Sequence, residues 1–473
     1  MALHTMKFGG TSVGSPEAIE QVLKIIQRDK AAGHDVVSVV SAMSGVTDSL
    51  LKTVSAAIEG DRWTYQEINR DIRHRHEEAT HRLIEPPSER EATLVEINRL
   101  LDEHLQLCEA INILGEATPR MIDAIISFGE RLSSRVVAAA LDSRGTPSKA
   151  FDSSQLIVTD NNYQDAEPLW EVTSSRIKQR LVPAIQEGIS PIITGFIGAT
   201  PDGTITTLGR GGSDFSAAII AAYIDSDDLT IWTDVDGVMT TDPRIDKRAK
   251  VLPYVSYTEV GELAFYGAKV LHPKTVQPII TRNIPMRVRN TFNPDHPGTQ
   301  IGADIVPSTS VIKAVTSIRS ISMLTVSGKG MLGVPGIAGR TFLATSRAGA
   351  NILMISQSSS EQSFCYTVRD SDANAVKDAV EAELKAEIEH QDVDGVEILK
   401  EVVIVTVVGG GMRGTPGVAG RVFTTLGNHN INVISIAQGG SECSISFVIE
   451  EQAIEEAVIC LHDLALAAVE NVN

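Results

Sequence analysis

Residues 6–40 read MKFGGTSVGSPEAIEQVLKIIQRDKAAGHDVVSVV, and their order sets the architecture of the first part of the chain. A glycine-rich turn follows a short apolar segment, and the amphipathic residues 16–31 predict a helix with proline in its first turn. VVSVV at residues 36–40 is short and β-branched, which predicts a buried strand. This order of strand, helix and strand favours neighbouring parallel strands.

The same alternation continues to about residue 300. SPIITGF (residues 190–196) and LTIWTDV (residues 229–235) predict two further buried strands, and residues 214–224 predict a helix. The pattern indicates an α/β fold with a mostly parallel sheet covered on both faces. Residues 55–115 interrupt it with charged, helical sequence broken at Pro86 and Pro87, which predicts a helical hairpin that leaves the core. Its histidines, which lack the HExxH spacing of a zinc protease, are expected on a solvated helix face: His74, His76 and His81.

An internal repeat fills the last third of the chain. Residues 328–363 match residues 409–444 without a gap, and 16 of the 36 aligned positions are identical. GMLGVPGIAGRTF in the first copy corresponds to GMRGTPGVAGRVF in the second. Each copy predicts strand, Gly/Pro loop, helix, strand, polar turn, strand and helix, so we expect two small α+β modules packed together. The turn-rich residues 293–309 are the expected boundary with the first part.

Length, charge and cysteine content narrow the classes of protein. At roughly 150 residues per domain, 473 residues suggest about three domains. The 60 acidic residues outnumber the 41 basic ones, and a net charge of −19 argues against nucleic acid or an anionic membrane as a partner. No apolar run approaches the length of a membrane span and no secretory signal is visible, so we expect a cytoplasmic protein. The four cysteines show neither CxxC nor a zinc spacing, so no disulfide framework and no protein-held metal are expected.

Each repeat also contains G-x-G-x-x-G after a predicted strand, which is typical of dinucleotide-binding turns and would suit a dehydrogenase. Two observations argue against that interpretation. A Pro-Gly pair follows each time, at residues 335–336 and 416–417, so the loop is longer than the tight fingerprint turn. The next strand then ends in Gln357 or Gln438, where a ribose would require an acid.

Two glycine-rich turns in the first part carry side chains suited to phosphate and carboxylate chemistry. Lys7 precedes Gly9 and Gly10, whose backbone can approach an anion closely while the lysine supplies a point charge. In TTLGRGGSD (residues 206–214), Arg210 offers a planar fork for a carboxylate and Asp214 stands where a helix begins. The alternative interpretations are a plain strand turn at Lys7 and a simple helix cap at Asp214.

The ordered series KFGGTSVG, VSAMSGVT, SFGERLSS, TGFIG, TTLGRGGSD, WTDVDGV, TTDPR and GAKVLHP resembles the motifs of the aspartate kinases. The series covers residues 6–292, and the repeats resemble the two ACT modules of the same enzymes. The resemblance implies an amino-acid kinase three-layer sandwich over residues 1–305, with the helical excursion at about 55–115. It implies two α+β, ferredoxin-like ACT modules over residues 310–397 and 398–473.

The resemblance implies roles for individual residues. Lys7 would bridge the ATP phosphates, and Asp214 would organise that lysine and the transition state. The implied aspartate contacts are Ser41, Thr47, Glu130, Phe196, Arg210, Gly211, Gly212 and Ser213. The implied nucleotide contacts are Lys7, Phe8, Gly9, Gly10, Thr233, Asp234, Met239, Arg244, Lys269 and Val270. Met239 departs from the aromatic residue that relatives often carry there.

The implied reaction is phosphorylation of L-aspartate by ATP to 4-phospho-L-aspartate, the first step toward lysine, threonine and methionine. The substrate's side-chain carboxylate has a pKa near about 4, so it is ionised at neutral pH and needs no general base. Lys7, Mg²⁺ and backbone N–H groups would instead neutralise the phosphoryl group as it transfers. We expect the phosphates of ATP to hold most of the Mg²⁺ coordination.

The repeats pair Asn351 and Gln357 with Asn432 and Gln438, and such amides suit recognition of a small zwitterion. Capping of strand ends is the alternative. By resemblance, ACT modules bind an end-product amino acid allosterically and dimerise edge to edge, which implies a homodimer or homotetramer. SQSSSEQSF (residues 356–364) resembles threonine-sensitive enzymes more than lysine-sensitive ones, so threonine is the expected effector and lysine the alternative. The rival functions are another amino-acid kinase of this fold and a catalytically silent amino-acid sensor.

Overall fold

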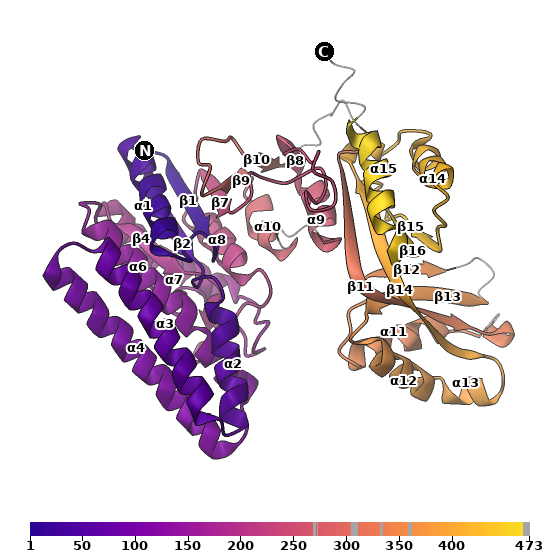
Figure 1. Ribbon diagram of the computed structural model, residues 1–473, viewed down its shortest axis with the longest axis horizontal. Helices are drawn as coiled ribbons and strands as arrows, with labels where there is room; N and C mark the ends of the chain where they lie inside the picture. The colour runs from indigo at the N-terminus through magenta and orange to yellow at the C-terminus, as the bar shows by residue number, and fades with distance from the viewer. Residues whose placement is uncertain (268–270, 272, 304–310, 332–333, 358–361, 467–473) are drawn as a thin grey trace, which may run out of the picture. The chain divides into compact units, whose positions relative to one another are not determined.

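The computed structural model describes residues 1–267, 271, 273–303, 311–331, 334–357 and 362–466. The chain forms two compact units (Figure 1). The first comprises residues 1–238, 253–257 and 270–304, and the second comprises residues 239–252, 258–269 and 305–473. Among the described residues, no helix combines the length and the apolar character that crossing a membrane requires.

An eight-stranded sheet forms the centre of the first unit, in the order β3-β4-β2-β1-β7-β9-β10-β8. All neighbouring strands in it are parallel except β9 and β10. The strands are β1 (Leu3–Phe8), β2 (Asp35–Val40), β3 (Ser148–Phe151), β4 (Ser190–Thr194), β7 (Asp228–Thr233), β8 (Tyr254–Ser256), β9 (Met286–Asn290) and β10 (Thr299–Gly302). A separate hairpin pairs β5 (Ile197–Ala199) with β6 (Ile205–Thr207). The buried strands expected near residues 36–40, 190–196 and 229–235 are therefore confirmed.

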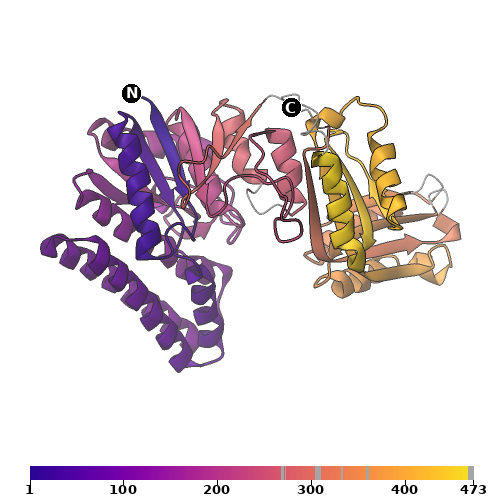
Figure 2. The same ribbon diagram turned by 45° about the horizontal axis from the view of Figure 1, so that its top comes forward.

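Helices cover both faces of this sheet. On one side α1 packs on β2 and contacts α6, which packs on β4 (Figure 2). On the other side α8 packs on β1 and β7, with α7 beside it. This confirms the expected three-layer arrangement. The helices of the first unit outside the excursion are α1 (Pro16–Ala31), α2 (Val46–Ile58), α5 (Pro119–Ile126), α6 (Phe128–Asp142), α7 (Trp170–Gln186), α8 (Gly212–Tyr223) and α10 (Pro273–Ile280).

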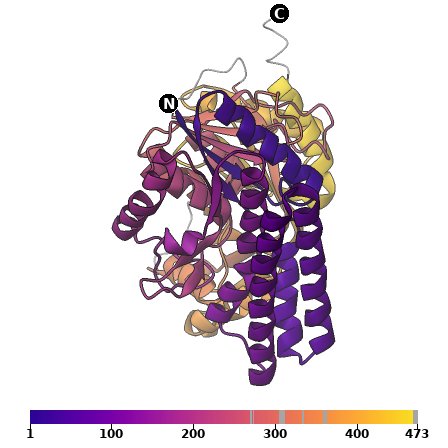
Figure 3. The same cartoon turned by 90° about the vertical axis from the view of Figure 1, so that its left-hand side faces the viewer.

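The helical excursion is an antiparallel pair, α3 (Arg62–Leu83) and α4 (Pro87–Leu114), which run side by side in Figure 3. Its histidines correct one expectation. His74 and His81 are exposed, but His76 is fully buried and its Nδ1 lies 2.7 Å from the carbonyl oxygen of Ile72. Burial lowers the pKa of His76 to about 4, so the ring is neutral at physiological pH. A charged-looking helix thus places one histidine on the face that packs inward.

The second unit is built on a six-stranded antiparallel sheet in the order β12-β13-β11-β14-β16-β15. Its two central strands, β11 (Ala314–Ser327) and β14 (Gly395–Val408), have 14 residues each and pair along nearly their whole length. The other strands are β12 (Met354–Gln357), β13 (Ser363–Arg369), β15 (Ser435–Ala437) and β16 (Ser444–Glu450). The helices are α11 (Ile337–Arg347), α12 (Ala373–Glu383), α13 (Lys385–Glu389), α14 (Val418–Asn428) and α15 (Ile454–Leu466), and α9 (Tyr257–Phe265) contributes most of its length.

The two modules share their central strands. Residues 321–327 of β11 pair with residues 395–402 of β14, whereas residues 314–318 pair with residues 404–408 in the stretch that also pairs with β16. Ser320 and Glu401 have φ values of 57° at this junction, where the register shifts. The strand that precedes the first repeat therefore completes the sheet of the second module, which the repeat alone does not reveal.

Close packing explains two glycines of the G-x-G-x-x-G spacing. A β-carbon on Gly328 would lie 2.2 Å from the carbonyl oxygen of Asp392, and one on Gly409 would lie 2.1 Å from that of Val311. Both distances are far below van der Waals contact, so the backbone approach requires glycine at each position. Gly328 and Gly409 are therefore explained by close backbone packing within the modules.

Candidate active site

A cavity of about 550 Å³ opens at the carboxyl ends of β1, β2 and β7. In an open α/β sheet this is the edge at which ligands bind. The residues that line it come from the turns after these strands and after β4, from the loop before α8, and from the starts of α2, α6 and α8. They are Lys7, Gly9, Gly10, Thr11, Ser41, Ala42, Met43, Ser44, Gly45, Thr47, Asp48, Glu130, Phe196, Gly209, Arg210, Gly211, Gly212, Ser213, Asp214, Thr233 and Asp234.

The turn after β1 is held by backbone hydrogen bonds to β7 and to the turn that follows β2. The Gly9 N–H donates to the Trp232 carbonyl at 3.1 Å, and the Ser44 N–H donates to the Gly10 carbonyl at 3.1 Å. A β-carbon on Gly10 would lie 3.0 Å from the carbonyl oxygen of Ala42, so a larger residue would push the two turns apart. The sequence Lys-Phe-Gly-Gly thus fixes a narrow backbone turn directly beside the lysine.

Two helices begin at the cavity without a capping side chain. Gly45 precedes α2 with φ 78°, and Gly211 precedes α8 with φ 75°, a conformation that glycine adopts without strain. The first backbone N–H groups of a helix have no partner within the helix, and the helix dipole adds partial positive charge there. Two such ends at one cavity favour a ligand with several negative charges.

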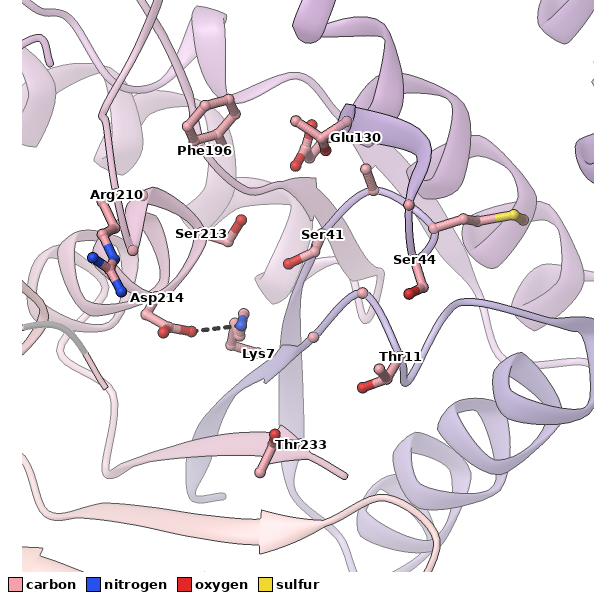
Figure 4. A pocket seen from close by; sticks show the side chains of 18 of the residues that line it. Lys7, Thr11, Ser41, Ser44, Glu130, Phe196, Arg210, Ser213, Asp214 and Thr233 are labelled. Atoms are coloured by element: carbon pink, nitrogen blue, oxygen red, sulfur yellow. Dashed lines mark ion pairs between the residues drawn. The ribbon is translucent and has the colours of Figure 1, made fainter. Parts of the chain in front are cut away.

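Lys7 and Asp214 meet inside the cavity. The Lys7 Nζ lies 2.6 Å from Asp214 Oδ1, and the two side chains are 12% and 14% exposed (Figure 4). Lys7 comes from β1 and Asp214 from the first turn of α8, so the pair joins the sheet to the helix. Asp214 fixes the position of the ammonium beside the glycine turn, which is what electrostatic stabilisation of a phosphoryl group requires.

Glu130 is the cavity's buried acid. Its residue is 3% exposed, and Oε2 has no hydrogen-bond partner within the described part of the chain. Burial raises the pKa of Glu130 to about 8, while hydrogen bonds from the backbone N–H groups of Ala42 and Glu130 oppose the rise. A carboxyl group in this state is suited to a cationic ligand group, because an ammonium would pair with it as it ionises.

The remaining expected substrate contacts gather around the same space. The implied aspartate contacts all line the cavity: Ser41, Thr47, Glu130, Phe196, Arg210, Gly211, Gly212 and Ser213. Figure 4 shows Arg210 and Ser213 on the same side as Asp214, and Ser41 and Ser44 on the turn after β2. Lys7, Gly9, Gly10, Thr233 and Asp234 line it as well. Residues that are 200 positions apart therefore form one site.

Five of the implied nucleotide contacts are absent from the lining of this cavity or lie outside the described residues. The side chain of Phe8 is fully buried and stacks on Trp232, with ring centroids 6.2 Å apart, so only its backbone could reach a ligand. Met239 and Arg244 belong to the second unit, and Arg244 pairs there with Asp242. Lys269 and Val270 lie outside the described residues.

Sequence reasoning missed several lining residues, chiefly Thr11, Ser44 and Asp48. The sequence did contain a sign of them, because Thr11 stands in KFGGTS, and Ser44 stands in VSAMSGVT, just before the Gly45 that precedes α2. The glycine turn after β2 leads into a helix, and like the turn after β1 it places backbone N–H groups where an anion can bind.

A second cavity of about 340 Å³ lies in the first repeat. Gln357, Gly336, Ile337 and Phe364 are among its lining residues, so the start of α11 and the end of β12 border it. The other amides singled out from the sequence are exposed and are not in its lining: Asn351, Asn432 and Gln438.

Comparisons with known proteins show which families the chain resembles. The amino acid kinase family model matches residues 5–290, and an ACT domain model matches residues 324–384 and 405–464. The chain is 35% identical to a bifunctional aspartokinase/homoserine dehydrogenase of Zea mays, covering 96% of this chain and 50% of that protein. It is 30% identical to the aspartokinase of Saccharomyces cerevisiae, covering 96% and 91%.

Among solved structures, E. coli aspartokinase III in complex with aspartate and ADP superposes with a TM-score of 0.83 at 30% identity, covering 98% of this chain and all of that one. The chain spans about half the length of the first curated relatives that it matches, which are bifunctional proteins.

Proposed function

Because this chain belongs to the aspartokinases of the amino acid kinase family, we propose that it transfers the γ-phosphoryl group of ATP to the side-chain carboxylate of L-aspartate, giving 4-phospho-L-aspartate. The observation that carries the proposal is the Lys7–Asp214 pair, 2.6 Å apart in a cavity bordered by two helix starts. The wider class, an ATP-dependent kinase, follows from the family itself.

The chemistry of the proposed step concerns charge. Both reacting groups are anions, so the site has to lower their mutual repulsion while it holds them in line. Lys7 would contact the transferring phosphoryl group, and the N–H groups at the starts of α2 and α8 would face its oxygens. Mg²⁺, when bound, would neutralise phosphate charge, and the nucleotide's phosphates would supply most of its ligands because Asp214 already pairs with Lys7.

Two residues would orient the amino acid. Glu130 would bind its ammonium from the buried end of the cavity, and Arg210 would hold its α-carboxylate through two parallel hydrogen bonds. Asp214 would position Lys7 and would not act as a base, because the acceptor carboxylate is already ionised.

Release of ADP in the presence of each candidate acceptor tests the proposal. We expect turnover with L-aspartate and at most a small fraction of that rate with L-glutamate or N-acetyl-L-glutamate. Faster turnover with either of the longer acids would favour another amino-acid kinase of this fold. Absence of turnover with all three, together with binding of an amino acid, would favour the silent sensor.

We also propose that an amino acid, threonine before lysine, inhibits the enzyme by binding at the repeats. The support is the 340 Å³ cavity that Gln357 borders, the ACT domain matches, and the threonine-like pattern at residues 356–364. Inhibition requires that the effector bind more tightly to one of two states of the enzyme. A homodimer or homotetramer formed through the ACT modules belongs to the same proposal, and light scattering at known protein concentration would measure it.

Gln357→Ala is expected to raise the threonine concentration for half-inhibition by about tenfold or more, because a hydrogen bond to a charged ligand is worth about 1.5–3 kcal/mol. Activity without threonine should stay at the wild-type level. Gln452→Ala is the matched control, since Gln452 is exposed and lies outside the repeated residues. Unchanged inhibition in Gln357→Ala, or inhibition by lysine but not threonine, would count against the assignment.

A further inference from the structure

Two histidines and an aspartate meet at the end of the first unit opposite the cavity. His4 lies near the start of β1, Asp29 lies in the last turn of α1, and His34 stands in the connection that leads to β2. His4 precedes Lys7 by three residues on one strand, so roughly 10 Å of strand separates them. The proposed phosphotransfer uses none of these three residues.

Their donor atoms converge. His4 Nδ1 lies 2.7 Å from Asp29 Oδ2, and one donor atom from each of the three residues lies within 4.8 Å of the other two. The rings of His4 and His34 have centroids 4.3 Å apart. The backbone N–H of His34 donates to the carbonyl of Asp29 at 3.3 Å, and this bond holds the connection against the end of α1.

One nitrogen in this group lacks a protein partner. The Nδ1 atom of His34 is buried, and within the described part of the chain it neither accepts nor donates a hydrogen bond. A buried polar atom without a partner is unfavourable unless something outside the protein satisfies it. The side chains of His4 and Asp29 are 23% and 22% exposed, so an ion could enter from solvent.

The basic residues on either side of Asp29 form ion pairs with other acids, so neither of them neutralises Asp29. Arg28 is directed to Asp295, at 2.8 Å, and Lys30 is directed to Asp35, at 3.2 Å. A cavity of about 310 Å³ adjoins His4 and Asp29, and Asp228 lines it as well. Arginines lie there too, but Arg287 approaches Asp228 at 3.9 Å and Arg289 donates to the carbonyl of Pro294.

We propose that His4, Asp29 and His34 bind a borderline divalent transition-metal ion, of which Zn²⁺ is the type. Two imidazoles and one carboxylate suit Zn²⁺, Co²⁺ or Ni²⁺, whereas Mg²⁺ prefers oxygen ligands alone. Three protein ligands leave a further position for water. The ion would join the start of β1 to the connection between α1 and β2. Sequence spacing gave no sign of it, because each donor comes from a different element.

Binding would require small changes in the three side chains. At metal–ligand distances of about 2.0–2.2 Å, donor atoms around a tetrahedral ion stand roughly 3.3 Å apart. His4 and Asp29 would separate slightly, and His34 would turn its free nitrogen inward. The metal would take the place of the hydrogen bond between His4 Nδ1 and Asp29 Oδ2.

Equilibrium dialysis of Co²⁺ against the full chain, prepared without a polyhistidine tag and in millimolar MgCl₂, tests the proposal. Wild type is expected to bind one Co²⁺ per chain with the intense visible absorption of a low-coordinate ion. His34→Ala should bind Co²⁺ at least about tenfold more weakly, because losing even an outer-shell partner typically costs 10–100-fold. His81→Ala is the matched control, since that histidine is exposed and far along the chain.

The supporting and the contradicting results differ in which variants bind Co²⁺. One ion bound by wild type and by His81→Ala, with binding at least about tenfold weaker in His34→Ala and in Asp29→Asn, supports the site. Equal Co²⁺ binding by all variants, or no stoichiometric binding by wild type, overturns it. Kinase activity of His34→Ala is expected to equal that of wild type, so this test succeeds or fails independently of the proposed phosphotransfer.

Discussion

Lys7→Ala is expected to lower kcat for phosphorylation of aspartate by about 10³-fold or more, because it removes the cation placed at the transferring phosphoryl group. The Lys7 ammonium is 2.6 Å from Asp214 and only 12% exposed, so no solvent-borne cation replaces it at the same position. Steady-state kinetics at saturating ATP and aspartate measures the effect.

The fold should survive this change. Lys7 lies at the end of a strand whose pairing with β2 and β7 is made by the backbone, and Asp214 remains near the positive end of α8. Circular dichroism and a thermal unfolding scan would show this. Lys24→Ala is the control, because Lys24 on α1 is 59% exposed and pairs weakly with Glu20. A wild-type kcat in Lys7→Ala would refute the charge argument.

Glu130→Gln is expected to raise KM for aspartate by about 30-fold or more while KM for ATP changes little, because truncating one partner of a buried charge pair costs roughly 2–5 kcal/mol. Glutamine keeps the size of the side chain and removes only the charge that would face the substrate's ammonium. Glu59→Gln, on an exposed acid after α2, is the control. An unchanged KM for aspartate would place the ammonium elsewhere.

The pH dependence gives a second readout of the same residue. With a pKa of about 8, Glu130 is mostly protonated in the free enzyme at pH 7, and binding of an ammonium requires it to ionise. KM for aspartate should therefore fall about tenfold from pH 7 to pH 8.5 in wild type, and this part of the dependence should vanish in Glu130→Gln.

The contribution of Glu130 to the stability of the fold should fall as pH rises, whereas its contribution to aspartate binding should grow. A carboxyl whose pKa is raised on folding favours the native state below its unfolded pKa, and that contribution is lost as pH rises from about 4.5 through 8. Glu130→Gln should therefore gain stability relative to wild type at pH 9 and differ little at pH 4.

Local sequence patterns predicted much of this structure because they reflect local physics. The strand, glycine turn, capped helix and strand of residues 6–40 appear as β1, α1 and β2, and Ser15 caps α1 by accepting a hydrogen bond from the Ala18 N–H. The two glycine turns likewise marked the cavity, because glycine is needed where backbones approach each other or φ is positive.

Long-range pairing was not predictable in the same way. Residues 239–252 and most of α9 belong to the second unit, although they precede the repeats by many residues. Buried contacts explain this: Lys313 Nζ lies 2.9 Å from Glu259 Oε1, and the Gly410 N–H donates to the same carboxylate at 2.6 Å. No periodicity in a single sequence shows that an acid in one segment meets a lysine 54 residues later.

The shared strands β11 and β14 illustrate the same limit. The repeat of residues 328–363 and 409–444 correctly indicated two similar modules. It could not indicate that residues 314–318, which lie before the first copy, pair in the sheet of the second, because strand partners are chosen by packing across the whole unit.

Trapping the reaction product with hydroxylamine tests the central claim most directly. An acyl phosphate reacts with hydroxylamine to give a hydroxamate and free phosphate, whereas simple ATP hydrolysis leaves nothing to trap. With ATP, Mg²⁺ and L-aspartate, wild type should form aspartyl hydroxamate in step with ADP, and Lys7→Ala should form almost none. ADP release without hydroxamate, or hydroxamate formed equally well by Lys7→Ala, would contradict the account.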